Sequence, residues 1–297
     1  MGAGDGLTVS PAVRRTVAEL GPDAARWLEQ VPTLVAETSA VWELTAGRAL
    51  PQQGCASVIL PVTTGEEVPA VLKLSVPHDE ARREADALRR WNGGGAVRVL
   101  RSSADGFTLL LERAEPGHDL WVVGIDEQIE VLTDLLPRLW TSPGPERPFR
   151  DLAETAACWA RQMQAKAAAM GVPSEVADRA RRWAGELAED QPGRLLHGDL
   201  HPGNVLAARR RPWLAIDPKP WVGDPAFDLA QVLANWVFVD VGPDGSAADA
   251  IRTRASKLAD ALSLDPGRVL RWAVVKAIGW DIGRDQTLVL DEAARAS

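Results

Sequence analysis

The chain has 297 residues, 46% of them hydrophobic and 25% charged, and its formal net charge is −8. This composition is typical of a soluble globular protein that buries a sizeable core in one large or two moderate domains. The negative balance argues against a nucleic-acid partner, because phosphate backbones attract clustered lysine and arginine. A small cationic molecule is compatible with it.

The cysteine pattern and the N-terminal sequence indicate the compartment. Cys55 and Cys158 are far apart and have neither disulfide-framework nor metal-ligand spacing. We expect both to be structural thiols in a reducing environment. The N-terminal residues lack a signal-peptide pattern, and no apolar run is as long as a membrane span. We therefore expect a cytoplasmic protein without a membrane partner, and a monomer is the default oligomeric state.

The first third of the chain is predicted to be two helices followed by strands. Residues 8–36 have the apolar spacing of two short amphipathic helices, which we expect on the outside of a first lobe. The period then changes to that of strands, expected at 41–44, 56–62 and 70–76. Turn residues separate these strands at 51–54 and 64–67, so an antiparallel meander is expected.

Lys73 stands in the middle of an apolar strand, Val71-Leu72-Lys73-Leu74. Such a lysine can simply snorkel from an edge strand. The next helix, expected to open near Asp79, offers two glutamates, and we favour Glu84 over Glu80 because it shares its stretch with apolar positions. A pair of this kind holds the lysine amine over the α- and β-phosphates of a nucleotide in kinases.

Gly54 and Ser57 are expected in a turn that covers these phosphates with backbone N–H groups. No GxGxxG motif is present, so an ordinary hairpin turn is the alternative. After Gly93-Gly94-Gly95, strands at 97–100 and 108–112 form a further hairpin. The composition changes just after this hairpin, and we expect the lobe boundary there. By analogy, the backbone near Glu112 and Ala114 would bind adenine.

The second part of the chain is predicted to be mainly helical, with helices at 125–139, 150–170 and 174–189 and further helices in the last third. Between them, Leu195-Leu196 leads into a polar loop, and a later short strand ends on Asp217. The spacing His197-x-Asp199-x-x-x-x-Asn204 is that of the protein-kinase catalytic loop. The alternative is an unrelated turn that happens to hold these residues.

These residue types fit phosphoryl transfer, which needs mainly positioning and charge. Asp199 would accept the proton of an attacking hydroxyl. Asn204 and Asp217 would supply oxygen ligands to Mg²⁺ on the phosphates. Beyond them, Asp224 is expected to cap the following helix, and Asp228 could accept backbone N–H bonds from the catalytic loop; we assign both a structural role.

The catalytic loop and the segments that follow it resemble the aminoglycoside phosphotransferase family. The stretch from Leu196 to Val205 is similar to its catalytic signature, and Gly223-Asp224-Pro225-Ala226-Phe227-Asp228-Leu229 to its usual sequel. Trp213 to Pro218 and the Trp280-Asp281 pair look most like the streptomycin 6-kinase and hydroxyurea phosphotransferase branch. The resemblance implies an α+β, protein-kinase-like bilobal fold. It consists of a small nucleotide-binding lobe with an antiparallel sheet (1–114) and a larger, mainly helical lobe with the catalytic loop and substrate pocket (115–297).

The same resemblance implies an O-phosphotransferase that uses ATP and Mg²⁺ to phosphorylate a hydroxyl of a small molecule, with streptomycin or a related aminoglycoside as the leading acceptor. Two departures stand out. Asp217 is followed by Pro218-Lys219-Pro220 and not by Phe-Gly, so no flipping DFG segment is expected, and the loop over the phosphates is poor in glycine.

A cationic acceptor needs carboxylates, because its ammonium or guanidinium groups must keep charge-assisted hydrogen bonds when they leave water. The candidate substrate residues are His201, Asp240, Asp244, Trp280, Asp281 and Asp285. Two alternatives to an antibiotic kinase stay open, since fold does not fix function. One is a kinase of another metabolite alcohol, such as a sugar or amino alcohol, and the other is a catalytically silent nucleotide-binding module.

Overall fold

The computed structural model describes residues 9–47, 54–146, 148–189, 191–241 and 245–295. The chain divides into two compact units, Met1–Gly117 and His118–Ser297. The first combines helices with one antiparallel sheet and the second is mainly helical, which confirms the predicted α+β class. The boundary expected from the sequence lies after Ala114, whereas the compact units part after Gly117.

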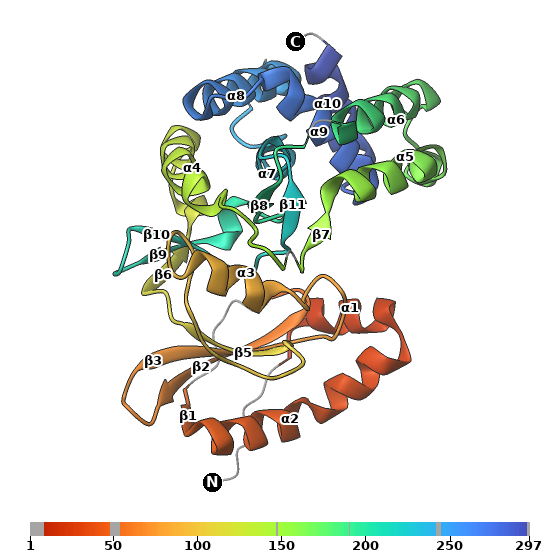
Figure 1. The fold of residues 1–297 in the computed structure, drawn as a ribbon. Helices are drawn as coiled ribbons and strands as arrows, with labels where there is room; N and C mark the ends of the chain where they lie inside the picture. The colour runs from red at the N-terminus through yellow and green to blue at the C-terminus, as the bar shows by residue number, and fades with distance from the viewer. Residues whose placement is uncertain (1–8, 48–53, 147, 190, 242–244, 296–297) are drawn as a thin grey trace. The chain divides into compact units, whose positions relative to one another are not determined.

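The sheet of the first unit has five antiparallel strands in the order β1-β2-β3-β5-β4. Their bounds are β1 Leu44–Ala46, β2 Ser57–Thr64, β3 Pro69–Ser75, β4 Val99–Ser102 and β5 Thr108–Glu112. In Figure 1 the long hairpin of β2 and β3 stands out. β3 lies between β2 and β5, so the strand that carries Lys73 is an inner strand and not an edge strand.

Helices α1 (Pro11–Leu20) and α2 (Pro22–Trp42) supply the apolar layer of this unit. Their buried valines and Trp27 pack in one cluster with the apolar residues of β2 and β3. The strand predicted at 41–44 is wrong, because α2 continues to Trp42 and ends with Glu43 in the left-handed region, at φ 56°. The strand β1 begins only at Leu44.

Helix α3 (Glu84–Trp91) begins five residues later than the predicted start at Asp79. The N–H of Ala81 bonds to the carbonyl of His78, and that of Glu84 to the carbonyl of Ala81. These three-residue steps form turns, so the segment before Glu84 winds without becoming an α-helix. Glu84 thus lies in the first helical turn, facing the core with 2% exposure.

The second unit contains two small sheets among its helices (Figure 1). One has the order β10-β9-β6, from Trp213–Ala215, Val205–Ala208 and Pro116–Asp119; the unit boundary falls within β6. The other has the order β7-β11-β8, from Arg150–Asp151, Trp221–Gly223 and Arg194–Leu196. Both sheets serve to hold the loop between β8 and β9.

The helices of the second unit are α4 Ile125–Leu139, α5 Leu152–Ala169, α6 Ser174–Glu189, α7 Ala226–Trp236, α8 Ala247–Leu262, α9 Pro266–Gly279 and α10 Arg284–Arg295, with 3-10 turns η1 Leu120–Val122 and η2 Pro202–Asn204. α7 is buried on all sides except at Asn235. Phe227 of α7 and Trp272 of α9 meet edge to face at 5.4 Å. None of the described helices combines the length and the hydropathy that a bilayer span requires.

Candidate active site

The loop with the predicted catalytic residues joins two short strands of the second unit. It leaves β8, where Leu195 and Leu196 are fully buried, and reaches β9 through η2. β9 pairs with β10 in an antiparallel hairpin, and the N–H of Ile216 donates to the carbonyl of Asn204 at 2.9 Å. This bond brings Asn204 and the residue after Ile216, Asp217, to the same end of the hairpin.

The carboxylate of Asp228 holds the start of this loop. It is fully buried in the first turn of α7 and accepts the N–H groups of His197 at 3.0 Å and Gly198 at 2.7 Å. The indole N–H of Trp140 adds a third bond at 3.0 Å. The supporting role expected for Asp228 is thus confirmed. Gly198 has φ +81°, and a Cβ there would lie 2.0 Å from the carbonyl oxygen of Lys219, so only glycine fits.

Asp224, the other acid to which the sequence assigned a structural role, accepts the N–H of Ala226 at the start of α7 at 3.0 Å. It also receives Arg268 Nε at 2.5 Å and the indole N–H of Trp272 at 2.6 Å, both from α9. The N-cap position of α7 is Pro225, so Asp224 binds the first helical N–H from one residue before the cap position. The same carboxylate joins α7 to α9.

His197 is buried, and its imidazole ring contacts the backbone of two segments of the site. Its Nε2 lies 2.9 Å from the carbonyl oxygen of Ile216, and its Nδ1 accepts the N–H of Asp199 at 3.3 Å. Burial lowers the pKa of His197, and the neutral ring with its proton on Nε2 satisfies both contacts. The imidazole therefore helps to orient Asp199 through its backbone N–H.

Both oxygens of the Asp199 carboxylate are bound by side chains from beyond the loop. Lys219 Nζ lies 2.5 Å from Oδ2, and Gln231 Nε2 donates to Oδ1 at 2.9 Å. With the residue only 7% exposed, these two donors fix the direction of the carboxylate. An ionised carboxyl has about four acceptor positions, so it keeps the capacity to accept a further proton donor.

Asn204 and Asp217 have the donor chemistry for a magnesium ion that arrives with phosphates. The Nδ2 of Asn204 donates to the carbonyl of Asp199 at 2.9 Å, which turns its Oδ1 away from that bond. Asp217 is held at φ 55° at the end of the hairpin. No cluster of three or more His, Cys, Asp or Glu ligands occurs among the described residues. One carboxylate and one amide oxygen fit Mg²⁺, which binds one or two protein groups and completes its shell with water and phosphate.

A fully buried lysine, Lys276 of α9, lies under the same loop. Its Nζ donates to the carbonyl of Gly198 at 2.8 Å and sits 4.1 Å from the Phe227 ring centroid and 4.3 Å from that of Trp280. Burial lowers the pKa of Lys276 to about 7, although the carboxylates of Asp199 and Asp228 oppose this shift. Aromatic faces stabilise the residual charge.

In the first unit the structure brings Lys73 and Glu84 together. Lys73 Nζ lies 2.6 Å from Glu84 Oε2, and the two side chains are 5% and 2% exposed. The edge-lysine alternative is therefore wrong, and the choice of Glu84 over Glu80 as the partner is confirmed. A buried lysine held by a buried carboxylate can present its charge to a ligand without losing its own position.

The other residues predicted to bind a nucleotide are Gly54, Ser57, Glu112 and Ala114, and Ser57 differs from its predicted position. Ser57 is not in a turn: it is the first residue of β2, and its hydroxyl meets that of Ser75 at 3.1 Å in the interior. Gly54 comes before this strand, and residues 51–53 of the expected turn lie outside the described residues. Glu112 ends β5 and accepts the N–H of Arg98 at 3.0 Å, while Ala114 follows in irregular chain.

Of the candidate substrate residues, two belong to the catalytic loop and its support. His201 accepts the N–H of Gly203 on Nδ1 at 3.1 Å and so shapes η2; burial lowers its pKa. Trp280 packs against Lys276, and its ring centroid is 5.9 Å from Lys219 Nζ. Trp280 is the residue that follows the end of α9.

The three acids that the structure describes among the candidates are exposed. Asp240 and Asp281 both have positive φ, and Asp285 forms an ion pair with Arg284 at 3.1 Å. Each is next in sequence to a residue that lines one pocket: Val239, Ile282 and Gln286. Gln231, the partner of Asp199, lines the same pocket. Asp244 lies outside the described residues.

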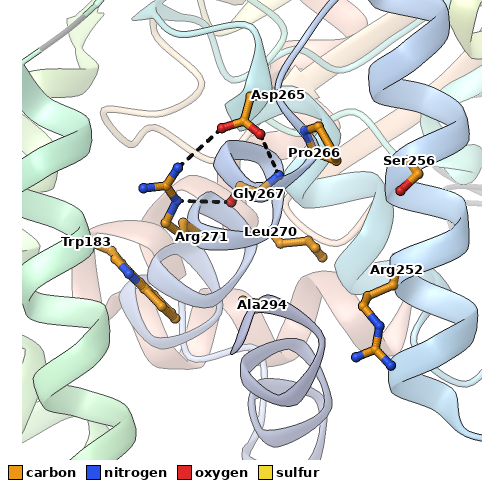
Figure 2. A pocket seen from close by; sticks show the side chains of 9 residues that line it. All are labelled: Trp183, Arg252, Ser256, Asp265, Pro266, Gly267, Leu270, Arg271 and Ala294. Carbon is orange, nitrogen blue, oxygen red and sulfur yellow. Dashed lines mark hydrogen bonds and ion pairs between the residues drawn. The ribbon is translucent and has the colours of Figure 1, made fainter. Parts of the chain in front are cut away.

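A second, larger hollow of about 640 Å³ lies at the start of α9 (Figure 2). Asp265 there accepts the N–H of Gly267 at 3.0 Å and pairs with Arg271 at 3.3 Å, so its charge already caps the helix. None of the predicted site residues lines this hollow.

Three residues around Asp199 and its loop are not predicted from the sequence: Lys219, Gln231 and Lys276. Lys276 carries a signal, because it interrupts the apolar helix Val274-Val275-Lys276-Ala277-Ile278 just as Lys73 interrupts its strand. Lys219 stands out only as part of the departure from Phe-Gly after Asp217. Gln231 has no distinguishing pattern.

Comparisons with known proteins identify relatives of this chain. The family model described as "Aminoglycoside/hydroxyurea antibiotic resistance kinase" matches residues 41–280. A streptomycin 6-kinase of Streptomyces glaucescens is 39% identical over 92% of this chain and 90% of its own length. A hydroxyurea phosphotransferase of Kitasatospora aureofaciens is 37% identical over 88% of this chain and 76% of its own length.

Among solved structures, the choline kinase LicA of Streptococcus pneumoniae matches with a TM-score of 0.61 and 14% identity, covering 91% of this chain and 99% of its own. This likeness establishes the kinase-like phosphotransferase fold expected from the sequence. The family match spans most of the chain, including Lys73, Glu84 and the loop with Asp199. The chain therefore belongs to the aminoglycoside/hydroxyurea antibiotic resistance kinase family.

Proposed function

We propose that the protein transfers the γ-phosphate of ATP to a hydroxyl group of streptomycin or a closely related aminoglycoside and so inactivates it. The observation that carries the proposal is the Asp199 carboxylate, held by Lys219 and Gln231 on a loop that also presents Asn204. The identity to a streptomycin 6-kinase over nine-tenths of both chains supports the choice of acceptor.

In this mechanism Asp199 accepts the proton of the acceptor hydroxyl as its oxygen forms the new bond to the γ-phosphorus. The bond between that phosphorus and the bridging oxygen of ADP breaks at the same time. Asn204 and Asp217 would hold Mg²⁺, which would offset the charge of the phosphate oxygens. Lys73, positioned by Glu84, adds positive charge at the α- and β-phosphates.

We assign nucleotide binding to the first unit, through Lys73 and Glu84 with the backbone near Gly54, Glu112 and Ala114. Acceptor binding is assigned to the second unit. The net charge of −8 and the exposed Asp240, Asp281 and Asp285 support a cationic acceptor. The proposal treats the enzyme as a cytoplasmic monomer without nucleic-acid or membrane partners, and light scattering of the purified protein tests the monomer.

The test is a coupled assay of ADP release with ATP and Mg²⁺ over a panel of acceptors: streptomycin, other aminoglycosides, hydroxyurea, choline and simple sugars. We expect selective turnover of streptomycin, with mass spectrometry showing the gain of one phosphoryl group. Turnover of a sugar or amino alcohol alone would overturn the antibiotic assignment and retain the mechanism. ATP binding without turnover of any acceptor would indicate a silent nucleotide-binding module.

A second candidate acceptor is hydroxyurea. The 37% identity to a hydroxyurea phosphotransferase favours it, since this is close to the identity to the streptomycin 6-kinase. Hydroxyurea is small and uncharged, so it has no cationic group to pair with the exposed carboxylates. Replacement of Asp281 by Asn should then raise KM for streptomycin and leave KM for hydroxyurea unchanged.

A further inference from the structure

A pocket of about 390 Å³ adjoins the side chain that holds the catalytic carboxylate. It is formed within the second unit by the end of α7, the segment that follows it and the start of α10. Its lining residues are Gln231, Ala234, Asn235, Val237, Phe238, Val239, Ile282 and Gln286. No lysine or arginine is among them. Of the lining residues, only Gln231 also bonds to Asp199.

The amide of Gln231 has only one possible orientation. A carboxylate only accepts hydrogen bonds, so the group 2.9 Å from Asp199 Oδ1 must be the NH₂. The carbonyl oxygen, Oε1, is therefore turned away from Asp199. The residue is 8% exposed, and Oε1 has no hydrogen-bond partner among the described residues. A buried acceptor without a donor is energetically unfavourable, and a ligand can supply the missing donor.

Asn235 lies one helical turn later and is exposed. Its Nδ2 donates to the backbone carbonyl of Gln231 at 2.9 Å, so its Oδ1 also faces away from the helix backbone. Residues four apart lie on the same face of a helix, and both line the pocket. Phe238 adds an apolar surface that is 57% exposed. Asp240, Asp281 and Asp285 each directly flank a lining residue in sequence. The pocket is thus lined by amide side chains beside an apolar surface.

We propose that Gln231 couples recognition of the acceptor to the position of the catalytic base. Its NH₂ orients Asp199, and its Oε1 accepts a hydrogen bond from an N–H or O–H group of a polyol, ammonium or guanidinium acceptor seated in this pocket. The inference rests on the proposed phosphotransferase function and adds a specificity-determining residue to it. An acceptor with a donor next to its reacting hydroxyl then completes the bonds of Gln231, whereas a simple alcohol does not.

Two substitutions distinguish the role of the amide NH₂ from the role of the amide oxygen. Gln231→Glu keeps an oxygen acceptor and loses the NH₂ donor, while Gln231→Met loses both at similar length. We expect both variants to lower kcat at least 10-fold with streptomycin, because Asp199 loses the hydrogen bond from Gln231 and keeps only the one from Lys219. KM for streptomycin should rise about 10-fold in Gln231→Met and stay at or below the wild-type value in Gln231→Glu.

The matched control is Gln164→Met. Gln164 also donates its Nε2 to a carboxylate, Asp178 Oδ1 at 2.8 Å, but on the exposed face of α5 and α6. This variant should keep wild-type kcat and KM. Streptomycin binding is measured separately by calorimetry with each Gln231 variant in the absence of ATP, where no turnover occurs, and circular dichroism checks that every variant is folded.

Each result bears on the proposal. Equal KM values for wild type and Gln231→Met, with kcat reduced by one factor for every acceptor, would leave Gln231 a positioning residue only and overturn the recognition role. Unchanged kcat in both variants would overturn the positioning role. If the panel identifies a different acceptor, the same variants are measured with that acceptor, so failure of the streptomycin assignment is distinct from failure of this inference. Absence of turnover with all acceptors would overturn both.

Discussion

Replacement of the buried Lys276 by Met should change the pH dependence of stability. Lys276 is 0% exposed and its pKa is lowered from 10.5 to about 7 by burial. Between these two pH values the unfolded chain binds more protons than the folded chain, so the lysine makes the folded state more stable as pH rises. From the two pKa values, this lysine costs the fold about 4 kcal/mol at pH 7 and about 2 kcal/mol at pH 9.

Methionine has a similar length and no titrating group, so the Lys276→Met variant lacks this pH-dependent cost. It also leaves the carbonyl of Gly198 without its bond from Nζ, a loss that does not depend on pH. The free energy of unfolding of wild type minus that of the variant should therefore rise by about 2 kcal/mol between pH 7 and pH 9.

The assay is urea unfolding followed by far-UV circular dichroism at pH 7, 8 and 9 for both proteins. Lys257→Met is the control, because that side chain is 52% exposed and pairs with Asp126 at the surface. Its difference from wild type should be nearly constant over this range. A difference for Lys276→Met that is equally flat, or that falls as pH rises, would refute the assignment of a lowered pKa to Lys276.

Three further substitutions test the site. Asp199→Ala should lower kcat by about 10²–10⁴-fold, in line with the loss of a general base, while the Kd for ATP measured by calorimetry stays within threefold. Lys73→Met should raise the Kd for ATP and lower kcat/KM, and it leaves the Glu84 carboxylate buried without its ammonium partner, so its melting temperature should fall as well. Gly198→Ala should destabilise the fold or displace the loop, since its Cβ would overlap the carbonyl oxygen of Lys219, and wild-type stability and activity in this variant would contradict that geometry.

The parts of the site that could be predicted from the sequence share one property: their chemistry fixes a short spacing or an unusual residue type. Asp199 and Asn204 are five residues apart on one loop. Lys73 interrupts an apolar strand and its partner follows eleven residues later. Such signals are local, so they survive without knowledge of how distant segments pack.

The parts that could not be predicted depend on packing between distant segments. Gln231 and Lys276 reach the loop from α7 and α9, 32 and 78 residues away from the atoms they bind. Nothing in a helical pattern says which face meets a given loop. The predicted end of α2 and the predicted start of α3 are wrong for a different reason, because the left-handed Glu43 and the three-residue turns before Glu84 set these positions. These are local backbone choices that apolar spacing does not encode.

The catalytic loop is therefore held in place by the pair α7 and α9 and not only by its own strands. Asp228 of α7 binds the N–H of Gly198, and Lys276 of α9 binds the carbonyl of the same residue. Asp224 in turn joins the start of α7 to Arg268 and Trp272 of α9. Because side chains from two helices bind the N–H and the carbonyl of one glycine, a small shift between α7 and α9 should move the neighbouring Asp199. Substitutions at the contact of Phe227 with Trp272 should consequently reduce kcat more than they reduce binding of either substrate.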